Sequence, residues 1–183
     1  MALKATICKA ELQIADMERN YFQDHALTIA RHPSETDERM MVRILAYAIH
    51  ADELLSFGKG LSDEDEPDLL LRDLTGVIKL WIEIGQPDEK RIRRACGRAD
   101  RVFVYVYGGN SSNLWWKQIG SEVARCRNLT VVQLPLSGKP LAQFAARNMQ
   151  LNCTIQDGQL WLADAQNSVM IEQEVLQAPA AAA

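Results

Sequence analysis

Alternating apolar and polar positions open the chain and predict β structure. In residues 4–14 every second side chain is apolar or small, a period that puts one face of a strand in the core and the other in solvent. A polar, turn-like stretch at 16–20 separates this strand from a second one over residues 21–31. The two segments therefore predict an N-terminal β-hairpin.

A long and largely apolar helix is expected next, over residues 35–55, with Ser34 as its N-cap. Its polar side chains fall in one narrow stripe, so the helix is apolar on most of its circumference and should be largely buried. The stripe consists of Arg39, Arg43, His50 and Glu53. Glu38 lies outside the stripe, near the buried face, where it is either a favourable charge at a helix start or a functional carboxylate.

The middle of the chain alternates strands with helices, which is typical of parallel strands joined by crossover connections. The expected segments are strand 69–71, strand 77–84, a helix between Asp88 and Gly97, strand 102–107, helix 112–125 and strand 129–134. A short helix at 141–147 and a second hairpin, 150–155 with 159–162, should follow. We expect a mixed α/β fold with one compact domain over residues 1–177 and a disordered Ala-rich tail at 178–183.

Two acidic residues flank the hairpin in the middle of the chain. If its turn has two central residues, at 75 and 76, Leu74 faces Val77 and, in the same register, Asp68 faces Glu83. Directly opposed residues have Cβ atoms about 5 Å apart, and two carboxylates there repel each other unless something compensates. A divalent cation such as Mg²⁺, a shared proton or a nearby arginine would each compensate.

Further polar residues accompany this acidic pair. Glu38 adds a third carboxylate from the start of the buried helix, and Gln86 and Lys90 follow Glu83 closely in the chain. Three carboxylates that converge at one end of a sheet indicate a metal site. The structural alternative is an acidic loop beside a strand, with Glu83 paired to one of the arginines that follow it.

Pro67-Asp68, followed about fifteen residues later by Glu83 at the end of an apolar strand, resembles the core of the PD-(D/E)XK nuclease superfamily. Longer stretches resemble the bacterial YaeQ family, and the resemblance covers nearly the whole chain apart from the tail. These stretches are residues 32–41 (HPSETDERMM), 57–62 (FGKGLS), 65–68 (DEPD) and 81–92 (WIEIGQPDEKRI). The resemblance implies a variant of the nuclease core with hairpins added at the N-terminus and C-terminus.

The chain departs from the nuclease motif where Gly85 stands in place of the lysine expected two residues after Glu83. Lys90 or Gln86 is the candidate replacement for the group that positions the attacking water. The resemblance implies hydrolysis of a phosphodiester in which Asp68, Glu83 and the carbonyl after Glu83 bind Mg²⁺. The implied catalytic set is Glu38, Asp68, Glu83, Gln86 and Lys90.

The distribution of charge along the chain says more about binding of nucleic acid than the net charge does. The net charge of −4 argues against indiscriminate binding of nucleic acid. Residues 62–73, however, carry a net charge of −5, whereas residues 86–101 carry +3. Arg91, Arg94 and Arg98 in the basic segment are therefore either contacts for a phosphate backbone or a solvated helix face that pairs with neighbouring acids.

Four scattered cysteines without C-x-x-C spacing, no signal peptide and no apolar stretch long enough for a membrane span predict a reduced cytoplasmic protein, with a monomer favoured. Two hypotheses follow. The chain is a Mg²⁺-dependent nuclease, or it is a catalytically silent nuclease-like module that binds nucleic acid or a protein partner in transcription or repair. The acids Asp68 and Glu83 favour the first hypothesis, and Gly85 favours the second.

Overall fold

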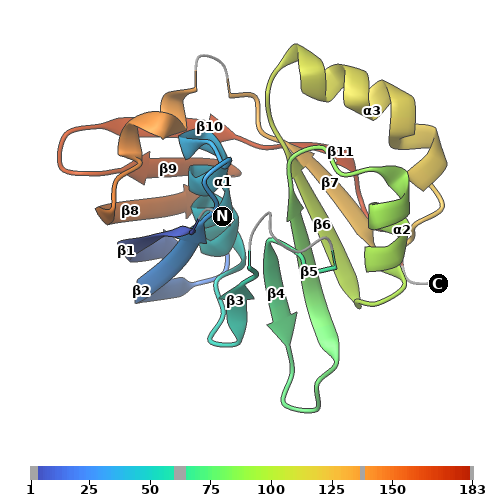
Figure 1. Cartoon of the computed structure of the whole chain (residues 1–183), viewed down its shortest axis with the longest axis horizontal. Helices are drawn as coiled ribbons and strands as arrows, with labels where there is room; N and C mark the ends of the chain where they lie inside the picture. Colours follow the sequence, from blue (N-terminus) through green and yellow to red (C-terminus); the bar gives the residue numbers. More distant parts are fainter. Residues whose placement is uncertain (1–3, 60–64, 137–138, 182–183) are drawn as a thin grey trace.

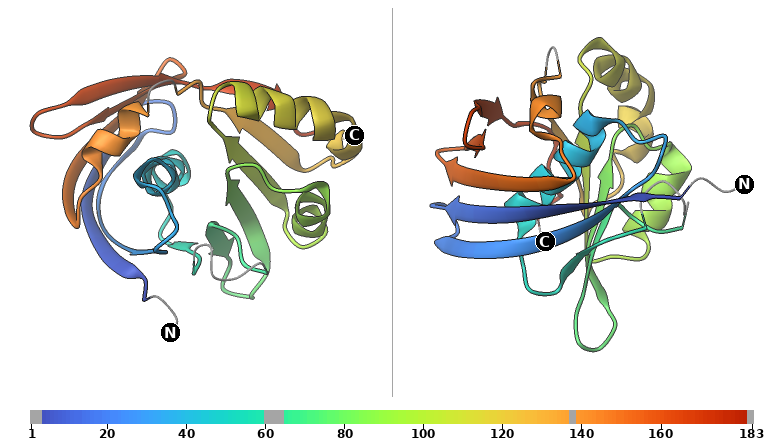
Figure 2. Two further views of the ribbon diagram at one scale, coloured as in Figure 1. Left: turned by 45° about the horizontal axis from the view of Figure 1, so that its top comes forward. Right: turned by 60° about the vertical axis from the view of Figure 1, so that its left-hand side comes forward.

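Helix α1 (Asp37–His50) lies between two β-sheets and forms the centre of the molecule (Figures 1 and 2). The computed structural model describes residues 4–59, 65–136 and 139–181. The main hydrophobic core joins α1 to both sheets, and every helix residue from Met40 to Ala48 is buried. Both sheets mix parallel and antiparallel pairs, so the mixed α/β fold predicted from the sequence is confirmed.

The five-stranded sheet contains the hairpins predicted near the two ends of the chain. Its strand order is β10-β9-β8-β1-β2. The strands are β1 (Thr6–Asp16), β2 (Tyr21–Arg31), β8 (Asn148–Gln156), β9 (Gln159–Ala163) and β10 (Ser168–Glu172). β1 pairs with β2 and β8 pairs with β9 in antiparallel fashion, while β8 lies parallel to β1. Both hairpins are therefore confirmed, and the parallel pair joins them into one sheet.

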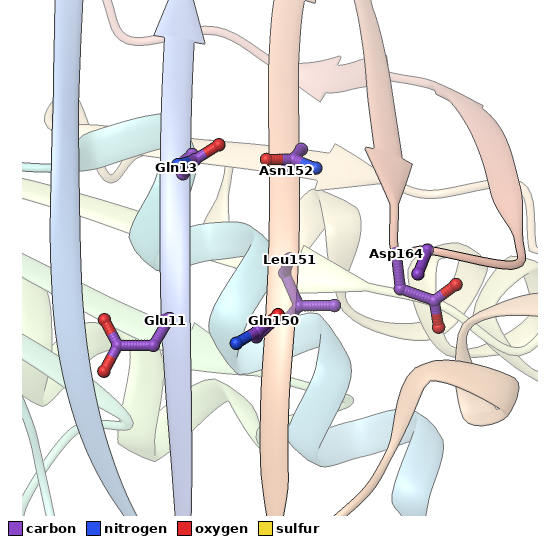
Figure 3. A pocket seen from close by; sticks show the side chains of 7 residues that line it. Glu11, Gln13, Gln150, Leu151, Asn152 and Asp164 are labelled. Atoms are coloured by element: carbon purple, nitrogen blue, oxygen red, sulfur yellow. The ribbon is translucent and has the colours of Figure 1, made fainter.

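Polar side chains of β1 and β8 line a hollow on the outer face of this sheet. The hollow has a volume of about 340 Å³ and is shown in Figure 3. It is lined by Glu11, Gln13, Gln150, Leu151, Asn152, Asp164 and Ala165. The polar residues of β1 and β8 in this set alternate along their strands with core residues, so the hollow lies on the side of the sheet away from α1.

The six-stranded sheet carries the acidic pair and has the order β11-β7-β6-β5-β4-β3. Its strands are β3 (Leu55–Phe57), β4 (Leu69–Arg72), β5 (Ile78–Ile84), β6 (Arg101–Val106), β7 (Leu129–Gln133) and β11 (Glu174–Gln177). β5, β6 and β7 are parallel and are joined by α2 (Glu89–Cys96) and α3 (Asn110–Val123), as the sequence predicts. These two helices cover the face away from α1, where Trp81 packs in a second hydrophobic core (Figure 1).

The structure corrects the bounds of the central helix. Thr36 is the N-cap, because its side-chain oxygen accepts a hydrogen bond from the backbone N–H of Arg39 at 3.2 Å; Ser34 lies outside the helix. The helix ends at His50 rather than at residue 55. Asp52 accepts two backbone hydrogen bonds, one through its side chain and one through its carbonyl, and this turns the chain into β3.

Several short elements were not expected from the sequence. These are β3, β10 and β11, each of five residues or fewer, while the short helix expected at 141–147 is a 3-10 helix at Pro140–Phe144. In the C-terminal tail the backbone N–H of Ala180 donates to the carbonyl of Arg127 at 2.8 Å, and residues 182–183 lie outside the described residues. Within the described ranges no helix is long and apolar enough to cross a membrane.

Leu45→Ala should lower the free energy of unfolding by about 2–5 kcal/mol, because the Leu45 side chain is fully buried in the core around α1 and its removal leaves a cavity. Leu74→Ala is the matched control, since Leu74 is 93% exposed in the β4–β5 turn and its loss should cost less than about 0.5 kcal/mol. Urea unfolding followed by circular dichroism measures both. Equal effects of the two substitutions would contradict the central position of α1.

Candidate functional site

The expected register places Asp68 beside Glu83. β4 pairs antiparallel with β5 through Leu69 and Ile82, and the backbone N–H of Asp68 donates to the carbonyl of Ile82 at 3.0 Å. Asp68 therefore lies opposite Glu83, one residue beyond the last pair of the ladder.

The predicted two-residue turn is wrong, although the register at the acidic pair is right. Asp73, not Leu74, pairs with Val77, so the turn has three central residues instead of two, and the Asp73 carboxylate accepts hydrogen bonds from the backbone N–H groups of Thr75 and Val77. A bulge between Leu71 and Arg72 then shifts the pairing by one residue. The longer turn shifts the facing pairs by one residue and the bulge shifts them back, so the pairing expected for Asp68 and Glu83 is restored.

Asp68 is held by the backbone of β5 and by α1. One oxygen, Oδ2, accepts a hydrogen bond from the backbone N–H of Ile84 at 2.7 Å. The other, Oδ1, accepts from Arg39 Nη2 at 2.8 Å and lies 3.9 Å from Arg43 Nε. The Asp68 side chain is 4% exposed, so it is a buried carboxylate with two arginines beside it.

Arg39 and Arg43 belong to a buried cluster of four charged side chains. Glu35 accepts from Arg39 Nη1 at 2.9 Å and from Arg43 Nη1 at 3.0 Å, and its carboxylate is fully buried. Burial alone would lower the pKa of Arg39, but Asp68 and Glu35 outweigh burial and raise it. Two guanidinium groups thus balance two carboxylates, and the Arg43 guanidinium also lies over the Phe57 ring at 5.5 Å.

Glu83 is paired on the other face of the sheet. Its Oε1 accepts a hydrogen bond from Trp81 Nε1 at 2.7 Å, and its Oε2 lies 2.9 Å from Arg91 Nε of helix α2. Burial raises the pKa of Glu83, the bonds from Arg91 and Trp81 act in the opposite direction, and the nearby negative charge of Asp68 adds a small increase. The alternative of a Glu83–arginine pair is therefore the arrangement observed.

The residues as arranged do not fit a divalent cation. The two oxygens expected to bind Mg²⁺ on the Asp68 side, Asp68 Oδ1 and the carbonyl of Ile84, both accept from the same nitrogen, Arg39 Nη2, at 2.8 and 3.2 Å. Both oxygens of Glu83 are engaged by Trp81 and Arg91. In the described part of the chain no three His, Cys, Asp or Glu side chains are grouped so that they could hold a metal.

Among the described residues, the other three predicted site residues form no hydrogen bond or ion pair with Asp68 or Glu83. Glu38 is buried near Lys139 and Tyr107; burial raises its pKa, and Lys139 opposes that shift. Gln86 is exposed, and its Nε2 donates to Ser111 Oγ on the first turn of α3 at 2.9 Å. Lys90 is exposed on the first turn of α2.

A basic hollow of about 370 Å³ lies on the first two turns of α2, lined by Asp88, Lys90, Arg91 and Arg94. Arg91 connects this hollow to the interior, because it bonds Glu83 and also donates through Nη2 to the carbonyl of Glu66 at 2.8 Å. Arg94 pairs with Asp65, and Arg98 is exposed beyond the helix end. The hollow therefore presents positive charge directly outside the buried Glu83.

The polar stripe of α1 is the part of the site that sequence reasoning missed. A stripe on an otherwise buried helix suggests a solvent-facing edge, whereas Arg43 is fully buried and the Arg39 side chain is 14% exposed. A signal was present in the spacing of Glu35, Arg39 and Arg43, which are four residues apart: in the helix expected from residue 35 they would share one face, and Glu35 in fact lies one residue before the N-cap.

Gly58 fixes the approach of the loop that precedes Asp68. Its backbone N–H donates to the carbonyl of Asp68 at 2.9 Å. A Cβ atom at position 58 would lie 2.0 Å from the carbonyl oxygen of Pro67, which is impossible without moving the backbone. The absence of a side chain at position 58 is thus part of what positions Asp68.

Comparison with known proteins finds relatives along nearly the whole chain. A family model described as YaeQ protein matches residues 1–173. Uncharacterized protein YaeQ of Salmonella typhi is 50% identical over 181 residues, covering 98% of this chain and 99% of that protein. That of Escherichia coli (strain K12) is 47% identical over 182 residues, again covering 98% and 99%.

Two solved structures share the fold. The crystal structure of YaeQ protein from Xanthomonas axonopodis pv. citri gives a TM-score of 0.92 at 48% identity, covering 96% of this chain and 99% of that one. The crystal structure of YaeQ protein from Pseudomonas syringae gives 0.89 at 33% identity, covering 95% and 97%.

Arg91→Ala should lower the free energy of unfolding by about 3–5 kcal/mol, because it leaves the Glu83 carboxylate buried without its counter-ion. Adding Glu83→Gln should recover most of this loss, since the Trp81 N–H can still donate to the amide oxygen. Urea unfolding of both variants tests this. Arg93→Ala, which removes surface ion pairs on the same helix, should cost less than about 1 kcal/mol; an equal loss in Arg91→Ala and Arg93→Ala would disprove the buried pair.

Glu38→Gln should raise the melting temperature at pH 7.5 by about 2 °C and leave it unchanged at pH 4. The folded-state pKa of Glu38 lies above its ordinary value, so folding favours the protonated form and charging the group as pH rises costs stability. When the pH lies below the ordinary pKa of a glutamate side chain, Glu38 is protonated in both the folded and the unfolded protein, and the advantage of glutamine disappears. Differential scanning calorimetry at the two pH values measures this, with exposed Glu53→Gln as control; a lower melting temperature at pH 7.5 is the contrary result.

Proposed function

Since the chain belongs to the YaeQ family, a membership that brings no assigned reaction with it, we propose a function from the site itself. The chain is a nuclease-like module that binds the phosphate backbone of a nucleic acid through helix α2 and does not hydrolyse it. The exposed basic side chains at this site are Lys90, Arg94 and Arg98.

One observation carries the absence of hydrolysis: both carboxylates of the acidic pair are neutralised by arginines of the protein. Arg39 binds Asp68 from α1, and Arg91 binds Glu83 from α2. A nuclease site of the kind the motif resembles needs these carboxylates for a metal that activates water. Here their charge is already balanced inside the fold, and of the candidate water-positioning groups Gln86 donates to Ser111 while Lys90 lines the hollow outside Glu83.

Binding of phosphate is supported by the charge outside the site. The hollow on α2 is lined by Asp88, Lys90, Arg91 and Arg94, of which Arg91 and Arg94 are paired with Glu83 and Asp65. Lys90 in the hollow and Arg98 beyond the end of the helix are exposed. Phosphate contacts made by lysine and arginine supply affinity without reading the base sequence. We therefore expect binding that depends strongly on salt and weakly on sequence, and we place the protein in the cytoplasm, where the cysteines found free in the structure match a reducing environment.

The magnesium-dependent nuclease is the second candidate, favoured by the register that puts Asp68 opposite Glu83. It requires Arg39 and Arg91 to release both carboxylates when substrate binds. A single experiment separates the two functions, because only the nuclease cleaves and only the nuclease needs a divalent cation.

Fluorescence anisotropy with labelled single-stranded and double-stranded DNA and RNA should show binding that weakens with salt and is unchanged by EDTA. Lys90→Ala should weaken binding to all sequences and reduce the slope of log K against log salt by about 1. Lys117→Ala, which removes an exposed lysine from α3, is the matched control and should bind like the wild type. Absence of salt-sensitive binding to every nucleic acid tested would refute the module.

Cleavage is assayed on the same oligonucleotides with Mg²⁺ or Mn²⁺. We expect intact substrate with the wild type and with Glu83→Ala. Cleavage by the wild type that Glu83→Ala abolishes would establish the nuclease in place of the silent module.

A further inference from the structure

We propose that the Arg39 guanidinium is a resident substitute for a divalent cation: it occupies the cation position between Asp68 and the carbonyl of Ile84, and its removal opens that position to a metal ion. The inference deepens the proposed function, on which it rests for the role of the site. It concerns the chemistry of α1 and β5 alone, however, and its test contains no nucleic acid.

The atoms bound by Arg39 are those that a hard cation selects. Arg39 Nη2 donates to a carboxylate oxygen of Asp68 and to a backbone carbonyl oxygen of Ile84, at 2.8 and 3.2 Å. Carboxylate and carbonyl oxygens are the ligands of Mg²⁺, Mn²⁺ and Ca²⁺ in proteins. A metal ion and this nitrogen cannot occupy the space between the two oxygens at the same time.

Arg39 is fixed in this position by its other bonds. Nη1 donates to Glu35 Oε1 at 2.9 Å, and Glu35 is itself bound by buried Arg43. Rotation of Arg39 away from Asp68 would break the bonds to Asp68 and Ile84 and leave a buried carboxylate without its nearest cation. A metal must therefore compete with a cation that is covalently part of α1 and locked by an ion-pair network.

A guanidinium differs from a metal ion in what it can do for chemistry. It neutralises Asp68 and donates hydrogen bonds in fixed directions, but it has no coordination position in which to bind and ionise water. Arg39 thus supplies one positive charge at the end of β5, half that of a divalent cation, and provides no activation of water. This explains why an acidic pair in nuclease-like register can coexist with a site that only binds.

The test measures Mn²⁺ binding by electron paramagnetic resonance and the shift of melting temperature on adding Mn²⁺. The wild type should leave the signal of free Mn²⁺ undiminished and show no shift. Arg39→Met keeps an unbranched side chain but has no charge, so it should bind Mn²⁺ and gain melting temperature with Mn²⁺. Arg39→Met combined with Asp68→Asn should lose both effects, because the carboxylate ligand is gone.

The contrary results are equally specific. Mn²⁺ binding by the wild type that Asp68→Asn abolishes would overturn the proposal, as would a folded Arg39→Met variant that binds no Mn²⁺. If Arg39→Met is unfolded without metal, it is refolded in Mn²⁺: recovery of the circular-dichroism spectrum supports the proposal, and failure to recover counts against it. None of these readouts depends on nucleic-acid binding, so this inference and the proposed function fail separately.

Discussion

The bonds of Arg39 connect the central helix to the sheet, and much of the molecule depends on them. This side chain joins Glu35 just before α1, Asp68 at the start of β4 and Ile84 at the end of β5. Loss of one partner from a buried ion pair typically costs about 3–5 kcal/mol, a large part of the stability of a domain this size. Arg39 and Arg43 can therefore be buried between the two sheets because the carboxylates of Glu35 and Asp68 are placed to receive them.

The two neighbouring acids, Asp68 and Glu83, are neutralised from opposite faces of the six-stranded sheet. Asp68 and Glu83 are opposite each other in register, yet Asp68 is bound by α1 and Glu83 by α2, which cover opposite faces of the six-stranded sheet. A metal would draw the two carboxylates toward one point. Separate arginines instead tie each carboxylate to the helix that covers its own face of the sheet.

Sequence patterns predicted the long elements and the register of the acidic pair but not the partners of its carboxylates. The bounds of β1, β2 and β5 were predicted to within two residues. β1 alternates so regularly that only one face of it can be buried, whereas β5 is buried on both faces from Leu80 to Ile84. The stripe of Arg39 and Arg43 was ambiguous, since a helix face directed at water and one directed at buried acids have the same composition. Short strands such as β3 were unpredictable because three residues contain less than two periods of alternation.

The close approach of Gly58 to Pro67 gives a sequence marker for the neutralised pair of Asp68 and Glu83. Position 58 is far from Arg39 in the chain and contributes no functional group, yet only a residue without a Cβ atom lets the loop before Asp68 pass at this distance. Chains that keep glycine here together with the arginine and the two acids have the means to build the same neutralised pair. A bulkier residue at this position would instead mark relatives whose loop takes another path, and whose carboxylates are free to serve a different chemistry.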